Sequence, residues 1–195
     1  LLTTSSGHLL VLDVSTPQSP QIATALHSDT YSAFRVAVAP EYAYTSAECG
    51  VQSSECQQNV IDLAVTSSMQ GRINTVDVTD PYNPQVMGVA KDSDGNEVIV
   101  TVADIVISKA SGLVYITAGN SVYIIDVKDP YNPKLLNIVT ATPIEPGSTT
   151  TTELGYSPAL VEKDGWVYLA SQNQGMRVLD LDPVVLMHYC SDFEF

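Results

Sequence analysis

Four copies of one short motif organise the sequence and constrain its fold more than any other feature. Each copy joins an apolar run to an aspartate and then to a turn that contains proline, at residues 12–20, 76–84, 125–133 and 179–183. The first copy has Thr16 where the second and third have a further aspartate, and the fourth is shorter and lacks the second proline. This recurrence indicates a repeat architecture.

Short strand-like runs surround every copy of the motif. The apolar runs before and after it predict two strands, and the motif itself predicts the turn between them, because proline cannot donate to a sheet and aspartate accepts bonds from turn backbone. Two more runs lie upstream in three copies, and the nearer one carries Tyr44, Tyr115 or Tyr168. We label the four predicted strands of a unit A, B, C and D, with A at residues 34–38, 104–107 and 159–161. The units are predicted at residues 1–30, 31–91, 92–139 and 140–195.

This organisation predicts an all-β fold. Sustained helical periodicity is absent, and repeated four-stranded antiparallel units are the blades of a β-propeller. The spacing from Tyr115 to Asp126, counted back from Asp13, reaches Leu2, so the chain is predicted to begin inside a strand B. We therefore expect about four blades of a larger ring of seven or eight. The alternative is a complete four-bladed ring in which the C-terminus supplies the missing strand.

The motif, together with the upstream tyrosine strand, resembles the LVIVD-repeat proteins, which are bacterial surface or secreted propellers. The resemblance covers all four units. It implies a propeller fold and an exported protein, but it implies no particular activity, because propellers host unrelated functions.

Three predicted insertions interrupt the otherwise short connections. Residues 47–70 lie between strands B and C of the second unit, and residues 91–101 and 140–157 lie between strand D of one unit and strand A of the next. In an antiparallel blade the B–C and D–A connections emerge on one face, here called the loop face. The A–B and C–D connections emerge on the other, here called the turn face. Because insertions on one face of a repeat array usually form its binding surface, we expect a partner at the loop face.

Two groups of acidic residues are candidate sites. Asp92, Asp94 and Asn96 surround a glycine, which is typical both of a solvent-exposed Asp-Gly turn and of a calcium-binding loop. The second group recurs at one position of strand C in every unit. That regularity favours acceptors that anchor turn backbone over a metal or catalytic site. Its members are Asp13, Asp77, Asp126 and Asp180.

The cysteines suggest the cellular compartment. Cys49 and Cys56 lie close together in a polar stretch, so we predict a small-loop disulfide and an oxidising environment. Zinc is the alternative, but two thiolates are only half of a zinc site. Cys190 has no evident mate and is interpreted as a buried thiol.

Charge and motif content exclude several functions. The chain has 22 acidic and 8 basic side chains and a net charge of −14, which argues against binding nucleic acid or anionic lipid. No apolar run is long enough for a membrane-spanning helix, so we predict no membrane insertion. The histidines, His8, His27 and His188, are scattered, and no common catalytic motif occurs.

These observations predict a non-catalytic interaction or adhesion module that binds a protein or glycan through the loop face. Its expected location is extracellular, periplasmic or on the cell surface. Two alternatives remain: a propeller enzyme with an axial active site partly outside this chain, and a self-assembling structural subunit of an extracellular assembly.

Overall fold

The computed structural model describes residues 1–4, 7–27, 35–44, 59–68, 70–119, 121–140, 159–171 and 175–180. In that part of the chain the regular secondary structure is β-strand, without any helix, which confirms the predicted all-β class. The same residues contain no helix with the length and hydropathy of a membrane span.

The strands form four antiparallel sheets, and each sheet follows the chain order from one edge to the other. The first contains β1 (Leu2–Thr3), β2 (Leu9–Asp13) and β3 (Gln21–Leu26). The second contains β4 (Arg35–Tyr44), β5 (Asn59–Ser67), β6 (Ile73–Asp77) and β7 (Gln85–Val89). The third contains β8 (Asp104–Ser108), β9 (Leu113–Ala118), β10 (Ser121–Asp126) and β11 (Lys134–Thr140). The fourth contains β12 (Ala159–Lys163), β13 (Trp166–Ser171) and β14 (Gly175–Asp180).

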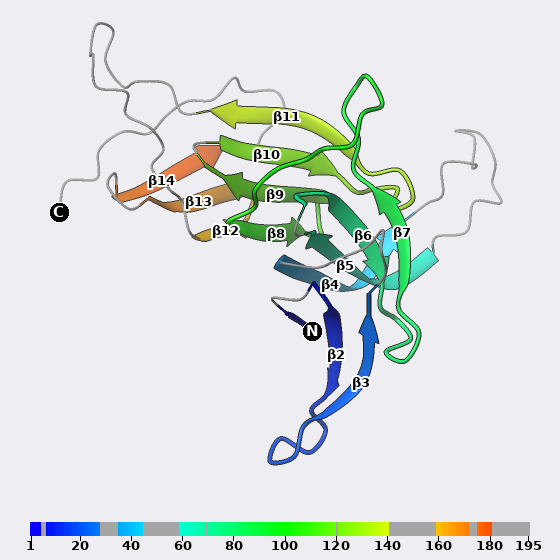
Figure 1. Ribbon diagram of the computed structural model, residues 1–195. Helices are drawn as coiled ribbons and strands as arrows, with labels where there is room; N and C mark the ends of the chain where they lie inside the picture. Colours follow the sequence, from blue (N-terminus) through cyan, green and yellow to red (C-terminus); the bar gives the residue numbers. More distant parts are fainter. Residues whose placement is uncertain are drawn as a thin grey trace, which may run out of the picture.

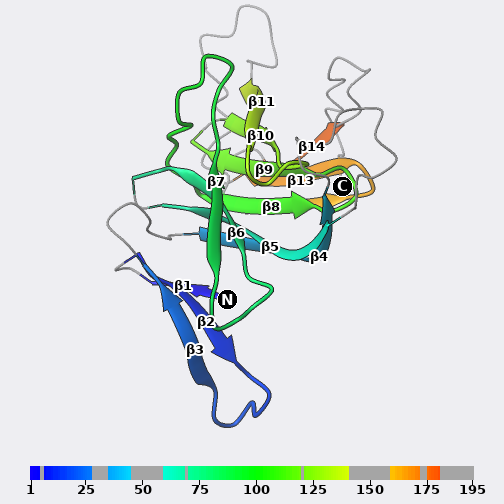
Figure 2. The ribbon, with the colours of Figure 1, turned by 90° about the vertical axis from the view of Figure 1, so that its right-hand side faces the viewer.

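The sheets pack face to face like propeller blades. The A strands are neighbours, since β8 contacts both β4 and β12, while β7 and β11 lie at the opposite edges of their sheets (Figure 1). Apolar clusters fill the spaces between consecutive sheets; the largest contains Leu63 and Val65 of the second sheet with Val114 and Ile116 of the third. The β2–β3 hairpin extends away from the other sheets in both views (Figures 1 and 2). The described residues form a propeller-like array and do not close a ring.

Equivalent irregularities support the repeat. The register between strands C and D shifts at Val11/Leu12, at Thr75/Val76 and at Ile124/Ile125 in the first three sheets. Each shift ends one residue before the strand-C aspartate. A bulge at one position in three sheets indicates that the motif specifies the same local backbone each time. Leu2 lies in β1, as the spacing predicted.

The strand assignment of the second unit was wrong. Residues 59–67, predicted to belong to an insertion, form β5, which pairs with both β4 and β6. Tyr44 is the last residue of strand A, paired with Asn59, and is not the equivalent of Tyr115 and Tyr168 in strand B. The cause is a bulge between Ala39 and Tyr42, where Glu41 has φ 50°, so that one long strand resembles two short ones in the sequence.

This correction moves an insertion to the other face. Residues 45–58 join β4 to β5, which is an A–B connection and belongs to the turn face. Residues 90–103 join β7 to β8, and residues 141–158 join β11 to β12, so these remain D–A connections. The prediction that all three insertions share the loop face is therefore wrong.

Candidate functional site

The recurrent aspartates anchor turns. The Oδ1 atoms of Asp13, Asp77 and Asp126 accept the backbone N–H two residues later, at 2.9, 2.9 and 2.8 Å. The Ser15 N–H lowers the pKa of Asp13, because it stabilises the charged carboxylate. The anchoring prediction is confirmed at these three positions, and the side chain of Asp180 lies outside the described residues.

The Asp92–Asn96 segment is a tight turn. Asp92 Oδ1 accepts the N–H groups of Asp94 and Asn96, each at 2.9 Å, and the Asn96 side-chain amide donates to Oδ2 at 3.2 Å. The Asn96 backbone N–H is the main cause that lowers the pKa of Asp92. These bonds correspond to the Asp-Gly turn interpretation. The part of the chain that the structure describes contains no group of three or more His, Cys, Asp or Glu side chains able to hold a metal, so calcium binding stays a prediction without structural support.

The 91–101 segment ties two sheets together. Lys91 donates its N–H to Pro133 O and accepts from Leu135 N in the third sheet, at 3.1 and 2.8 Å. Further along, Val98 donates to Ala90, the residue after β7, at 2.8 Å, and Val100 donates to Gly71, in the connection between β5 and β6, at 2.9 Å. Backbone bonds thus hold this predicted binding loop in place. It leaves β7 at the outer edge of the array (Figure 1).

Several predicted features lie outside the described residues. These are Cys49, Cys56, Cys190, His188, the strand predicted from the apolar run after the fourth copy of the motif (residues 184–186) and, apart from Thr140, the 140–157 insertion. Of the predicted 47–70 insertion, residues 59–68 and 70 are described.

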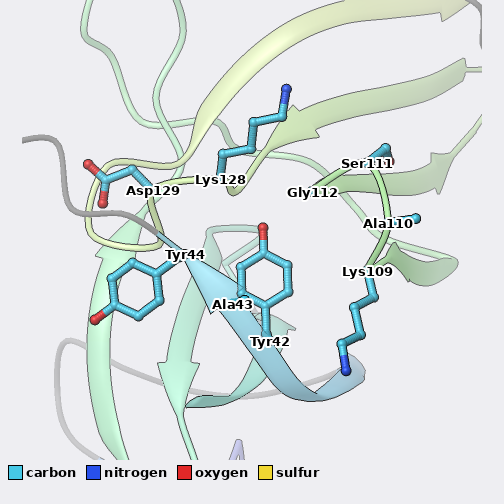
Figure 3. Close-up of a pocket in the computed structure, with 9 residues that line it drawn as sticks. All are labelled: Tyr42, Ala43, Tyr44, Lys109, Ala110, Ser111, Gly112, Lys128 and Asp129. Carbon is cyan, nitrogen blue, oxygen red and sulfur yellow. The ribbon is translucent and has the colours of Figure 1, made fainter. Parts of the chain in front are cut away.

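A pocket of about 420 Å³ lies between the second and third sheets on the turn face. Its walls come from the end of β4, from the β8–β9 turn and from the residues that follow β10 (Figure 3). The lining residues are Tyr42, Ala43, Tyr44, Lys109, Ala110, Ser111, Gly112, Lys128 and Asp129.

Tyr42 fixes one wall of this pocket. Its ring is only 2% exposed, and its hydroxyl donates to Val127 O of the third sheet at 3.1 Å. Burial, with a smaller contribution from the Asp126 charge, raises the pKa of Tyr42 to about 12. The neighbouring Gly112 has φ +66°, and a Cβ there would lie 2.8 Å from the Tyr42 hydroxyl. The turn can approach the tyrosine this closely only because residue 112 is glycine.

Tyr44 fixes the neighbouring wall. Its ring packs in a T-shaped arrangement with Tyr131, in the Asp-Pro turn of the third sheet, with centroids 6.2 Å apart. Burial raises the pKa of Tyr44 to about 12, supported by its hydrogen bond with Tyr131 and by nearby acidic charges. Both tyrosines therefore stay neutral near pH 7.

The charged groups of the pocket lie at its rim. Lys109 and Lys128 are exposed, their side chains point in different directions (Figure 3), and neither forms an ion pair with another described residue. Asp129 is already engaged, since its carboxylate accepts Tyr131 N at 3.0 Å and the Asn132 amide at 2.8 Å. The pocket thus combines a neutral, largely buried aromatic wall with two exposed lysines and the hydrogen-bonded carboxylate of Asp129.

Sequence reasoning did not find this pocket. It singled out Tyr44 but placed it in the wrong strand, and it gave no role to Tyr42, Lys109 or Lys128. The pocket depends on the side-by-side placement of two sheets, for which the local sequence carries no signal. A comparison with known protein families and with curated proteins finds no match for this chain.

Proposed function

We propose that this chain is a non-catalytic interaction module that binds a protein or glycan partner through the turn-face pocket between the second and third sheets. The observation that supports this proposal is a preformed pocket with two exposed lysines on its rim, neither of which forms an ion pair with a residue that the structure describes. The proposed face differs from the loop face inferred from the sequence, because the pocket lies among the A–B and C–D connections.

The two lysines at the rim of the pocket favour an anionic partner group, although the chain as a whole is acidic. Lys109 and Lys128 are two of only 8 basic side chains on a chain with a net charge of −14. Their ammonium groups can pair with a carboxylate or sulfate of a partner, beside the negative charge of Asp129. A partner that presents acidic side chains or acidic sugar groups supplies such groups.

The state of the tyrosines favours binding over catalysis. A general acid or base needs a pKa near the working pH and a free position toward the substrate. The pKa of Tyr42 is about 12 and its hydroxyl is committed to Val127 O, so it meets neither condition. A propeller enzyme with an axial active site, and a self-assembling structural subunit, remain the alternative functions.

We further propose that the chain belongs among the LVIVD-repeat propellers, on the strength of the four Asp-Pro motifs, and that it works outside the cell, in the periplasm or at the cell surface. The compartment follows from the proposed Cys49–Cys56 disulfide.

Charge reversal tests the pocket. Binding of the full chain to immobilised heparin and to poly-glutamate, measured at low salt, supplies a sulfated glycan and an acidic peptide as probes. We expect the double variant Lys109→Glu/Lys128→Glu to lose about tenfold or more in affinity for the probe that binds, and we expect salt to weaken wild-type binding. The matched control is Lys163→Glu, which reverses an exposed lysine at the end of β12 on the same face but outside the pocket.

The outcomes separate clearly. Equal losses in the pocket variant and the control would mean that general charge, not the pocket, attracts the probe. A wild-type chain that binds neither probe at low salt would contradict the proposal outright.

A further inference from the structure

Two histidines that lie far apart in the sequence meet at one end of the β2–β3 strand pair. His8 immediately precedes β2, and His27 immediately follows β3. Their ring centroids are 4.4 Å apart and the ring planes are tilted by 32°. His27 is exposed and His8 is half-buried, so ions in solution can reach the pair.

The hairpin register brings these rings together. Leu9 pairs with Leu26, so His8, just before Leu9, lies opposite His27, just after Leu26. The backbone at His8 is held as well, since Thr4 N donates to His8 O at 3.0 Å and His8 N donates to Thr4 Oγ1 at 3.1 Å. The fold therefore places these two residues opposite each other.

We propose that His8 and His27 form a bidentate site for a borderline transition-metal cation of the Zn²⁺, Ni²⁺ or Cu²⁺ class. Neutral imidazole nitrogen is a preferred ligand of these ions, and water completes the coordination. Two imidazoles on adjacent strands hold the second ligand at high effective concentration once the first has bound. The net charge of −14 also raises the local concentration of cations.

This site is separate from the proposed interaction pocket. It lies in the first sheet, at the loop face, where β1 connects to β2, whereas the pocket lies at the turn face between the second and third sheets. Its ligands are nitrogen donors, so it also differs from the calcium site predicted at the Asp92 turn. Bound metal would link the ends of β2 and β3.

The test is metal titration of the untagged full chain at pH 7.5. Isothermal titration calorimetry with Zn²⁺ alone and with Ni²⁺ alone should give one site of micromolar affinity. His8→Asn and His27→Asn should each weaken it by about 100-fold, because a chelate is reduced to a single ligand. His188→Asn is the matched control, since it removes the third histidine of the chain, and it should change the affinity by less than twofold. Millimolar Ca²⁺ should not compete.

A measurement on the wild type distinguishes a loss of metal binding from a loss of folding in the variants. Nitrogen chemical shifts of the imidazole rings should move for His8 and His27 on addition of one equivalent of Zn²⁺. Circular dichroism of the variants checks that they fold. Affinity weaker than millimolar, binding that survives both substitutions, or binding lost with His188→Asn would overturn the proposal.

Discussion

Gly88 is the position where one added methyl group should have the clearest effect. It lies in β7, and a Cβ there would be 2.6 Å from Tyr131 O, 2.7 Å from Pro133 Cδ and 2.8 Å from Pro130 O. All three atoms belong to the Asp-Pro turn of the third sheet, and two are backbone atoms that cannot move without the turn. The Thr75 hydroxyl donates to Pro130 O at the same contact between the second and third sheets, here called the joint.

The magnitude follows from these contacts. Glycine inside a strand ordinarily costs about 0.5–1 kcal/mol relative to alanine, so Gly88→Ala would stabilise the chain if nothing opposed the methyl group. Overpacking opposes it by about 1–3 kcal/mol. Displacement of the turn also weakens the Thr75 bond, which contributes about 1 kcal/mol. The net expectation is a loss of about 2 kcal/mol, or roughly 4–8 °C in Tm for a chain of this size.

Urea unfolding measures the change. Circular dichroism reports the whole chain, and the fluorescence of Trp166, the single tryptophan, reports the fourth sheet. Thr75→Val should cost about 1 kcal/mol in the wild type and less in Gly88→Ala, because both substitutions act on one joint and are not additive. Unchanged or increased stability of Gly88→Ala would refute the close contact between these sheets. Full additivity of the two substitutions would refute the shared joint.

Two further predictions concern the sequence motifs. The pKa of Asp92 is lowered in the folded chain, so the stabilisation that its carboxylate provides is present above the ordinary value of 3.8 and is lost as the pH falls through the lowered value. Asp92→Asn should therefore make the free energy of unfolding fall less steeply with decreasing pH in the acid range. An unchanged pH dependence would contradict the anchoring role. If Cys49 and Cys56 form the proposed disulfide, intact mass after alkylation of the native chain should increase at these positions only when reductant is added. Labelling without reductant would remove the argument for an oxidising compartment.

The sequence predicted best what each repeat specifies locally. An aspartate followed by proline at a strand end restricts the backbone to a turn, and the bonds made by Asp13, Asp77 and Asp126 follow directly from that chemistry. Strands C and D flank these turns, so the sequence located them as well. The all-β class follows from the same pattern.

The errors in the predicted strands arose where the local sequence indicated a strand end but the strand continued. Pro40 and Glu41 indicate a break, yet a bulge lets β4 continue through them. Once β4 was divided in two, the real strand B at residues 59–67 had no place and was assigned to an insertion. The A–B connection was then placed on the wrong face. One bulge therefore added a third insertion to the binding surface inferred from the sequence.

The two candidate sites escaped sequence reasoning for different reasons. The His8–His27 pair is hidden by sequence distance, but it depends only on the register of one hairpin, and counting outward from Asp13 and Gln21 through the bulge would have found it. The turn-face pocket depends on how two sheets pack, which involves residues from three separate turns and strands. No count along the chain supplies that information.

The identical Asp-Pro-Tyr-Asn-Pro sequences of the second and third units show why repeats do not specify their own packing. In the third unit this turn packs on Thr75 and Gly88 of the preceding sheet. Thr75 donates a hydroxyl hydrogen bond, and Gly88 leaves room for the turn because it has no side chain. The positions in the first sheet that match these two by register are Val11 and Thr24. Valine offers no hydroxyl and threonine carries a branched side chain, so the turn of the second unit cannot make the same joint with the first sheet. The motif thus determines the turn, whereas the preceding sheet determines where the turn packs. Substituting Gly88 should therefore loosen the joint between the second and third sheets and leave the joint between the first and second unchanged.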